Sequence, residues 1–122
     1  MLIQDLWICQ KNGIVLFSYV KNEKVNSDLF GGMIAALDSY AKGLSEGGLC
    51  NFDLDKMRIT LLEKNNLIFV ANSSNKIKIQ KLEEELNKIA KRFFELYPEN
   101  SFNTNYGQTH LFYNFKKELE QI

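Results

Sequence analysis

The segment LWICQKNGIVLFSY, residues 6–19, predicts an antiparallel β-hairpin. Large apolar and β-branched residues, which favour strands, fill residues 2–10 and residues 14–20 on either side of a short polar link. Asn12-Gly13 lies in that link, and Asn-Gly is typical of a type I′ turn because both central positions need positive φ. Apolar residues occupy both parities of the first strand, so we expect a central strand that is covered on both faces.

A helix is predicted next, over residues 27–44. Ser27 can cap its N-terminus, Asp28 lies where the helix dipole favours negative charge, and Gly47-Gly48 follows its end. Its apolar residues recur at three- and four-residue spacing and form one stripe, which indicates an amphipathic helix. The stripe consists of Leu29, Phe30, Met33, Ile34, Leu37, Tyr40, Ala41 and Leu44.

Three short strands and two helices are predicted in the remainder of the chain. The strands span residues 49–54, 57–63 and 67–71, and Asn65-Asn66 joins the last two because Asn tolerates left-handed backbone. An amphipathic helix over residues 76–97 is expected to pack on the chain's own sheet rather than form a coiled coil, and Pro98 ends it. Thr109 is expected to cap a last helix with Leu111, Phe112, Phe115, Leu119 and Ile122 facing inward. The order ββαβββαα predicts an α+β sandwich in one domain, residues 1–122.

Length, charge and cysteine usage exclude several classes of protein. A chain of 122 residues that is 45% hydrophobic can bury a core without disulfides or metal. Its formal net charge of +0 argues against a nucleic-acid reader and against binding to anionic lipid by charge alone. No segment reads as a signal peptide or an integral membrane span. Cys9 and Cys50 are isolated, so a reducing cytoplasm is the expected compartment.

The sequence contains no catalytic constellation. His110 could act as a base for Cys9 or Cys50, but capping or packing is the favoured role, and both thiols are expected to be buried on strands. Asp53 and Asp55 alternate along a strand, where a solvated edge is favoured over a metal site. Glycine-rich phosphate-binding motifs are also missing from the sequence. We therefore expect a protein that is not an enzyme and has no metal or cofactor.

Small residues form the opposite side of the first predicted helix, and this side is the candidate partner-binding surface. Glycine inside a helix costs about 1 kcal/mol relative to alanine, so its presence there requires a reason. A small-residue face lets another backbone approach closely, either a loop of the same chain or a second chain. Its members are Gly32, Ala35, Ala36, Ser39 and Gly43. An exposed edge strand, residues 49–54 or 14–20, is the second candidate contact, through sheet extension.

The order of elements resembles the longin-like (SNARE-like) domain family, especially its compact archaeal versions. The best-matching positions are Gly13 in the first turn, Leu16-Phe17 on the second strand, Phe30 opening the helix and Phe93 in the second helix. The strings that carry the resemblance are LWICQKNGIVLFSY, DLFGGMIAALDSYAKGL, MRITLLEKNNLIFVAN and RFFELY. The resemblance implies a five-stranded antiparallel sheet with one helix on one face and two on the other, and no catalytic residues.

The resemblance also implies a function. Longin domains occur in vesicle fusion proteins, adaptor subunits, tethering complexes and the signal-recognition-particle receptor, where they bind partner proteins and often small Ras-like GTPases. The expected function is a non-catalytic interaction module that forms homo- or heterodimers and serves as a platform or regulator for a small GTPase or a trafficking-type complex. Its partner would be a GTPase or another longin or roadblock domain, and the lack of a fusion motif disfavours direct action in membrane fusion.

Two alternatives remain beside this expectation. A roadblock-like module shares the functional theme, but it normally begins with a helix, so the strand-first order disfavours it. A small-ligand sensor of the PAS or profilin-like kind would instead place Trp7, Phe17, Phe69 and Phe94 around a pocket. Five strands with aromatic residues do not distinguish such a pocket from a filled core.

Overall fold

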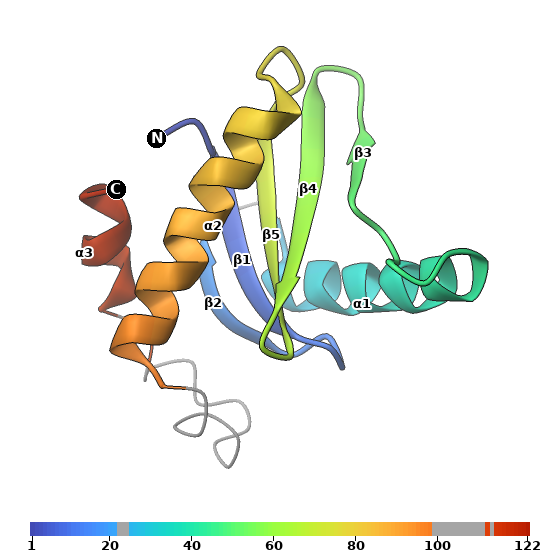
Figure 1. The fold of residues 1–122 in the computed structure, drawn as a ribbon, viewed down its shortest axis with the longest axis horizontal. Helices are drawn as coiled ribbons and strands as arrows, with labels where there is room; N and C mark the ends of the chain where they lie inside the picture. Colours follow the sequence, from blue (N-terminus) through green and yellow to red (C-terminus); the bar gives the residue numbers. More distant parts are fainter. Residues whose placement is uncertain (22–24, 99–111, 113) are drawn as a thin grey trace.

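A five-stranded antiparallel sheet carries α1 on one face and α2 and α3 on the other (Figure 1). The computed structural model describes residues 1–21, 25–98, 112 and 114–122. The elements are β1 (Asp5–Gln10), β2 (Val15–Tyr19), α1 (Ser27–Leu44), β3 (Asn51–Asp53), β4 (Met57–Lys64), β5 (Leu67–Ser74), α2 (Ile79–Leu96) and α3 (Phe115–Glu120). The sheet order β2-β1-β5-β4-β3 places β2 and β3 at its edges. The predicted fold class and the order ββαβββαα are confirmed.

The first hairpin closes through a three-residue turn and not through the predicted type I′ turn. The N–H of Gln10 donates to the C=O of Ile14 (2.8 Å), and the N–H of Gly13 donates to the C=O of Gln10 (2.9 Å). In this turn Gly13 alone has a positive φ, +94°. The side chain of Asn12 instead accepts the N–H of Ile14 (3.0 Å). Lys11 belongs to the loop, and loops of this length need a left-handed residue only at their last position.

The second hairpin closes as predicted, through Asn65 (φ 51°) and Asn66 (φ 66°). The connection that follows β5 differs from the prediction, because β5 continues to Ser74 and α2 begins three residues later than expected. Ser74 causes this shift. Its hydroxyl accepts the N–H of Lys76 (3.2 Å) and its C=O accepts the N–H of Ile77 (3.3 Å), so these residues form a turn instead of the first turn of the helix.

The larger core lies between the sheet and the helices α2 and α3. Phe93 of α2 is at its centre, with ring centroids of Phe69, Phe94, Tyr97, Phe112 and Phe115 between 5.0 and 5.8 Å away. The helix therefore packs on the chain's own sheet, as predicted. Phe112, Phe115 and Leu119 are buried as expected, whereas Ile122 is exposed. The predicted cap Thr109 and Leu111 lie outside the described residues.

The smaller core lies between the sheet and α1. The indole N–H of Trp7 donates to the hydroxyl of Ser27 (3.1 Å), and the Trp7 ring lies 4.1 Å from that of Phe30. Because Ser27 is engaged in this way, the N-cap is Asn26, whose side-chain oxygen accepts the N–H of Leu29 (3.1 Å). The prediction that Ser27 caps the helix is wrong by one residue.

Candidate interaction surface

The helix α1 contacts the sheet through a narrow line of residues. Within α1, Gly31, Ile34 and Asp38 are buried. Gly31 faces the first hairpin so closely that an added Cβ would lie 2.5 Å from the backbone oxygen of Gly13 and 2.6 Å from Cγ2 of Val15. This glycine lets the helix backbone approach the turn of the β1–β2 hairpin.

Most of the predicted apolar stripe points away from the core. Leu29 is 73% exposed, Tyr40 76% and Leu44 80%, and Met33 and Leu37 are exposed as well. The expectation that the whole stripe faces the core is therefore wrong for α1, because only Ile34 of the stripe is buried and the other buried residues, Gly31 and Asp38, lie outside the stripe. The C-terminal half of the helix also extends past the sheet (Figure 1). Large apolar side chains are thus available to a partner.

The small-residue side of α1 lies next to these exposed side chains. A Cβ added at Gly32 or at Gly43 would meet no atom within 4 Å. Ala36 and Ser39 are exposed, while Ala35 is half-buried beside Gly13. The described part of the chain thus leaves this side open, apart from Ala35. We call the exposed uncharged residues of α1 together the α1 face: Leu29, Gly32, Met33, Ala36, Leu37, Ser39, Tyr40, Gly43 and Leu44.

Asp38 fixes the segment that leads from α1 into β3. Its carboxylate accepts the N–H of Leu49 (3.0 Å) and pairs with the ammonium of Lys42 (3.2 Å). Gly48 has φ +71°, and a Cβ there would lie 2.6 Å from the Asp38 carboxylate. The carboxylate of Asp38 therefore holds the approach to β3 against the helix.

A second carboxylate links α1 to the sheet. Glu63 of β4 pairs with Lys42 (3.1 Å) and with Lys11 of the first hairpin (2.9 Å). The hydrogen bond from Lys11, supported by that from Lys42, lowers the pKa of Glu63. The hydrogen bond with Glu63, followed by that with Asp38, raises the pKa of Lys42. These partly exposed pairs are screened by salt and add little to stability, but they orient the helix.

The strand β3 is an edge of the sheet, as predicted for residues 49–54, although it is only three residues long. It pairs with Arg58–Thr60 of β4, and the N–H of Leu61 donates to the C=O of Cys50 (2.8 Å). The other edge is β2, within the second predicted stretch, residues 14–20. Both candidate edges for sheet extension therefore exist, and the polypeptide that enters β3 runs beside α1.

Those residues considered for chemistry that the structure describes, Cys9, Cys50, Asp53 and Asp55, do not come together. Cys9 is buried as expected, but Cys50 is exposed because it precedes β3. Asp53 ends β3 and pairs with Arg58 (2.7 Å), while Asp55 lies in the following turn, so the two carboxylates do not share a strand face. His110 lies outside the described residues. Among the described residues, no group of three His, Cys, Asp or Glu side chains could hold a metal ion.

The two thiols should differ in reactivity. Burial raises the pKa of Cys9 to about 12, so its reactive thiolate is scarce at neutral pH. We expect a thiol reagent at pH 8 to label Cys50 rapidly and Cys9 only after denaturation. Mass spectrometry of the labelled chain checks this result, with Cys50→Ser as the control that should remain unlabelled while folded. Rapid labelling of Cys9 in that variant would contradict the buried position of β1.

The aromatic residues proposed to line a ligand pocket lie on opposite faces of the sheet. Trp7 belongs to the core beneath α1, whereas Phe17, Phe69 and Phe94 contact the core beneath α2. The ring of Phe69 packs edge-on against Phe94 at 5.7 Å. These side chains fill two cores, and they do not surround one cavity.

Comparisons with known proteins agree with this architecture. No family model and no curated protein sequence matches the chain. Among solved structures, the fold is similar to Myxococcus xanthus MglB (TM-score 0.61, 13% identity, covering 77% of this chain and 79% of that chain). It is also similar to a Roadblock/LC7 domain from Streptomyces avermitilis (TM-score 0.64, 13% identity, covering 80% of this chain and 86% of that chain). A third similar structure is the gliding protein MglB from Thermus thermophilus (TM-score 0.59, 11% identity, covering 70% of this chain and 70% of that chain). The chain has a roadblock/longin-like fold.

The roadblock/longin-like fold confirms the family resemblance at the level of architecture and corrects one argument made from the sequence. The strand-first order predicts that a roadblock-like module is disfavoured, yet the structure is similar to a Roadblock/LC7 domain over 80% of this chain and 86% of that chain. None of the helices described in this fold is long and apolar enough to cross a membrane.

Proposed function

We propose that the protein is a non-catalytic interaction module that dimerises through the α1 face and acts as a platform or regulator for a small Ras-like GTPase or a trafficking-type complex. The observation that carries this proposal is the exposure of large apolar side chains along α1, including Leu29, Tyr40 and Leu44. Contiguous exposed apolar surface on a small domain is typical of a protein contact. The similarity to MglB and Roadblock/LC7 structures supports the same class of function.

The composition of the α1 face suits close contact between two copies of the chain. Gly32, Ala36 and Gly43 leave room for a neighbouring backbone, while the larger side chains next to them supply apolar area. Fully burying one Leu or Met side chain contributes about 1.5–3 kcal/mol. The free edge of β3 lies at the end of the segment that follows α1, so a second copy could also extend the sheet there. One MglB structure is described as having a tetrameric arrangement, which supports self-association.

No member of the α1 face is charged, and Asp28 in the first turn is the one exposed charged residue of α1, so we expect a weak salt dependence. Association through shape and burial should change little with ionic strength, whereas charge-driven association would weaken steeply. The partner is a second copy, another longin or roadblock domain, or a GTPase that uses the paired module. We place the protein in a reducing cytoplasm, which its two free thiols favour.

Replacing Ala36 by arginine should separate the dimer. The added side chain projects from the α1 face into the proposed contact and leaves the fold intact, because Ala36 is exposed. Light scattering of the wild-type chain should give twice the chain mass of 14.2 kDa, and Ala36→Arg should give one chain mass. Asn87→Arg makes the same charge change on exposed α2 and should remain dimeric. A wild-type monomer, or an Ala36→Arg chain that still pairs, contradicts the proposed contact.

The GTPase part of the proposal has a separate measurement. The purified chain is mixed with candidate small GTPases, and both binding and the rate of nucleotide exchange are followed. We expect a complex with at least one of them and a changed exchange rate. If no GTPase binds and no exchange rate changes, the GTPase part of the proposal is wrong, and only the dimeric module remains.

A further inference from the structure

Two loops form one protruding end of the molecule, beyond the strands β3, β4 and β5 (Figure 1). Residues 54–56 connect β3 to β4, and residues 75–78 connect β5 to α2. Asn75 joins the two loops, since its backbone N–H donates to the C=O of Lys56 (3.1 Å) and its side-chain amide donates to the C=O of Asp55 (3.1 Å). The two loops are therefore held together as one surface.

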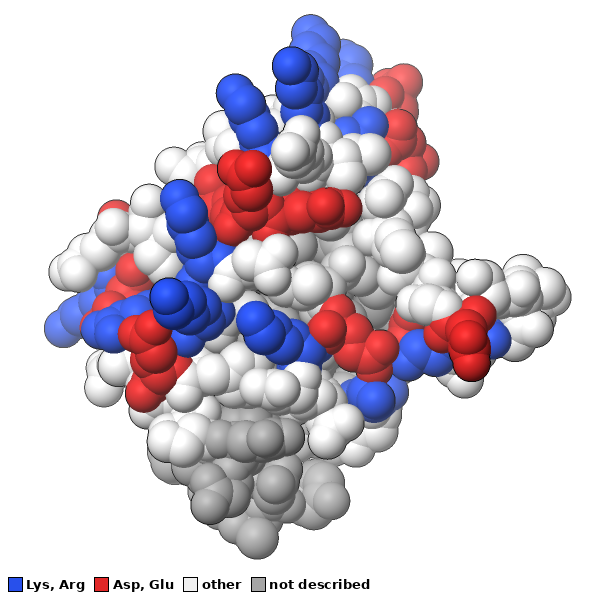
Figure 2. Space-filling model, viewed as in Figure 1, with Lys and Arg blue, Asp and Glu red and all other residues white. Residues whose placement is uncertain are grey.

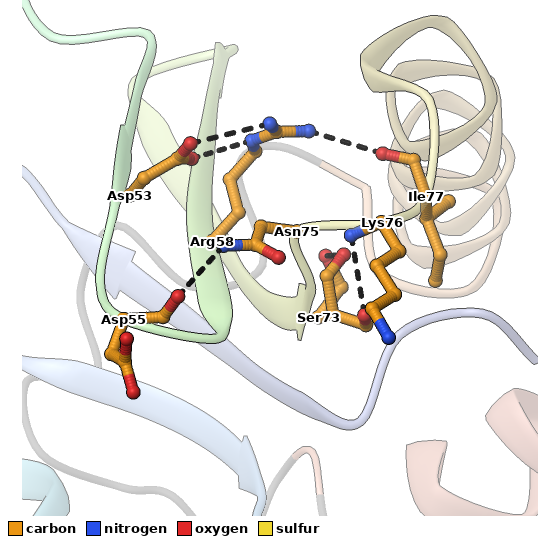
Figure 3. A network of polar contacts seen from close by, with 8 residues as sticks. Asp53, Asp55, Arg58, Ser73, Asn75, Lys76 and Ile77 are labelled. Carbon is orange, nitrogen blue, oxygen red and sulfur yellow. Dashed lines mark hydrogen bonds and ion pairs between the residues drawn. The ribbon is translucent and has the colours of Figure 1, made fainter.

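Arg58 strengthens the same end from within. Its guanidinium donates to both carboxylate oxygens of Asp53 (2.7 and 3.4 Å) and to the C=O of Ile77 (3.0 Å), as Figure 3 shows. Arg58 thus connects β3, β4 and the loop before α2, and its charge is balanced by Asp53. Bidentate arginine–carboxylate contacts fix geometry well, so the loop backbones have a defined arrangement.

Four lysines gather on this end. Lys56, Lys76, Lys78 and Lys81 are exposed, and among the described residues none of their ammonium groups lies in an ion pair. Figure 2 shows basic side chains clustered where α2 begins, with acidic side chains beside them at the β3–β4 end and below them on α2. Asp53 is paired with Arg58, and the only carboxylate within these two loops is that of Asp55. Although the whole chain is neutral, this end carries a local excess of positive charge.

The beginning of α2 adds to that excess. Its N-cap, Lys78, makes no side-chain capping bond, and its first turn contains no acidic residue. The N-terminal end of the helix therefore lies in a basic surrounding, although a helix N-terminus ordinarily favours negative charge. The sequence places lysines where the helix dipole is already positive.

Two apolar side chains protrude beside the lysines. Leu54 is 53% exposed and Ile79 is 36% exposed. Leu54 lies in the β3–β4 connection and Ile79 is the first residue of α2, so both belong to the end that Asn75 and Arg58 hold together. We call this surface the lysine tip: Leu54, Lys56, Lys76, Lys78, Ile79 and Lys81.

We propose that the lysine tip docks on an anionic lipid bilayer. Lysines attract a negatively charged leaflet, and each one near the surface contributes roughly fivefold to affinity. Leu54 and Ile79 can enter the interface between headgroups and acyl chains, as apolar side chains of peripheral proteins do. The tip is convex and lacks the arginine and aromatic anchors that dominate protein contacts, which favours a flat lipid surface over an acidic protein. This inference is independent of the α1 face.

The test is cosedimentation with vesicles of phosphatidylcholine that contain phosphatidylserine, and with vesicles of phosphatidylcholine alone. We expect the wild-type chain to bind the anionic vesicles and to be released by raised salt. The double variant K76E/K78E should bind at least tenfold more weakly, because two favourable contributions of roughly fivefold each are lost. The double variant K64E/K91E makes the same net charge change at exposed positions elsewhere and should bind like the wild type. Circular dichroism checks that both variants are folded.

Three outcomes would overturn the proposal. The wild-type chain could fail to sediment with anionic vesicles at low salt, or both double variants could lose binding equally, which would indicate net charge rather than a site. K76E/K78E could also bind vesicles normally while losing an acidic protein partner, and the tip would then be a protein contact. The variant Leu54→Gln tests the apolar part of the tip. If the Leu54 side chain enters the interface between headgroups and acyl chains, this variant should bind anionic vesicles more weakly than the wild type at physiological salt.

Discussion

Phe93→Ala is expected to lower the free energy of unfolding by about 3–5 kcal/mol, the largest effect of any single substitution considered. Phe93 is fully buried and its ring packs against rings from β5, α2 and α3, among them Phe69 and Phe115. Removing it deletes apolar contacts and leaves a cavity at the point where these elements meet, which the rigid sheet cannot collapse to fill. A loss of that size is a large fraction of the roughly 5–15 kcal/mol that holds an ordinary domain.

Urea unfolding monitored by circular dichroism measures this effect. Phe93→Leu keeps most of the apolar volume and should lower the free energy of unfolding by less than Phe93→Ala does. This variant can still be measured if the alanine variant fails to fold. Lys91→Ala, at an exposed position of the same helix, should change stability by less than about 0.5 kcal/mol. A Phe93→Ala chain as stable as Lys91→Ala would contradict the central place of this ring.

Gly31→Ala should be the second most damaging change, with a loss of about 2 kcal/mol or more. Alanine normally stabilises a helix relative to glycine, but a Cβ at this position would lie 2.5 Å from the backbone oxygen of Gly13. The obstacle is backbone, so the contact is relieved only when α1 moves away from the first hairpin. That movement would weaken the packing of Ile34 and Phe30 under the helix.

Gly32→Ala is the matched control for this position. The two glycines are neighbours in one helix, but a Cβ at Gly32 would meet no atom within 4 Å. In the Ala36→Arg background, which lacks the proposed dimer contact, its replacement should therefore stabilise the chain by up to about 1 kcal/mol through helix propensity, and Gly31→Ala is compared in the same background. Opposite signs for the two variants are expected in urea unfolding. Equal effects would show that α1 does not lie on the hairpin through Gly31.

Local patterns were enough to predict the architecture. The runs of apolar and β-branched residues on either side of Asn12-Gly13 predicted the hairpin, and the Asn65-Asn66 pair predicted a turn with left-handed backbone, because both signals act within a few residues. The period of α2 predicted a helix packed on the sheet, since its charged and apolar sides are clearly separated. Errors in the bounds of helices and strands lay at their ends, as at Ser74, whose hydroxyl and carbonyl accept two N–H groups that a longer helix would have used.

The side of α1 that faces the sheet could not be predicted in this way. Apart from Asp28, Asp38 and Lys42 the helix is uncharged, so charged residues do not mark which side faces solvent. The rule that apolar residues face inward therefore does not choose between the large apolar stripe and the other sides of the helix. The structure buries Gly31 and Asp38 and exposes Leu29. This choice follows from the close approach to Gly13 and from the hydrogen bond between Asp38 and Leu49, which are contacts between residues distant in sequence.

The lysine tip could not be predicted from the sequence for a related reason. The formal net charge of fifteen basic and fifteen acidic residues is zero, and this value does not say where the charges lie in the fold. Lys56 and Lys76 are twenty positions apart and become neighbours because β4 pairs with β5, with Met57 opposite Ser74, and because Asn75 joins their loops. Arg58 and Asp53 cancel each other locally, which leaves the lysines as the excess.

The sparse contact between α1 and the sheet has a consequence for motion. A helix that buries three of its residues and is otherwise held by Trp7 and by salt-screened ion pairs can detach at a lower free energy than the strands beneath it. Its backbone amides should therefore exchange with solvent faster than those of β1 and β5. A partner that covers Leu29, Tyr40 and Leu44 would slow exchange in α1 selectively, so binding and local opening of this helix are thermodynamically linked.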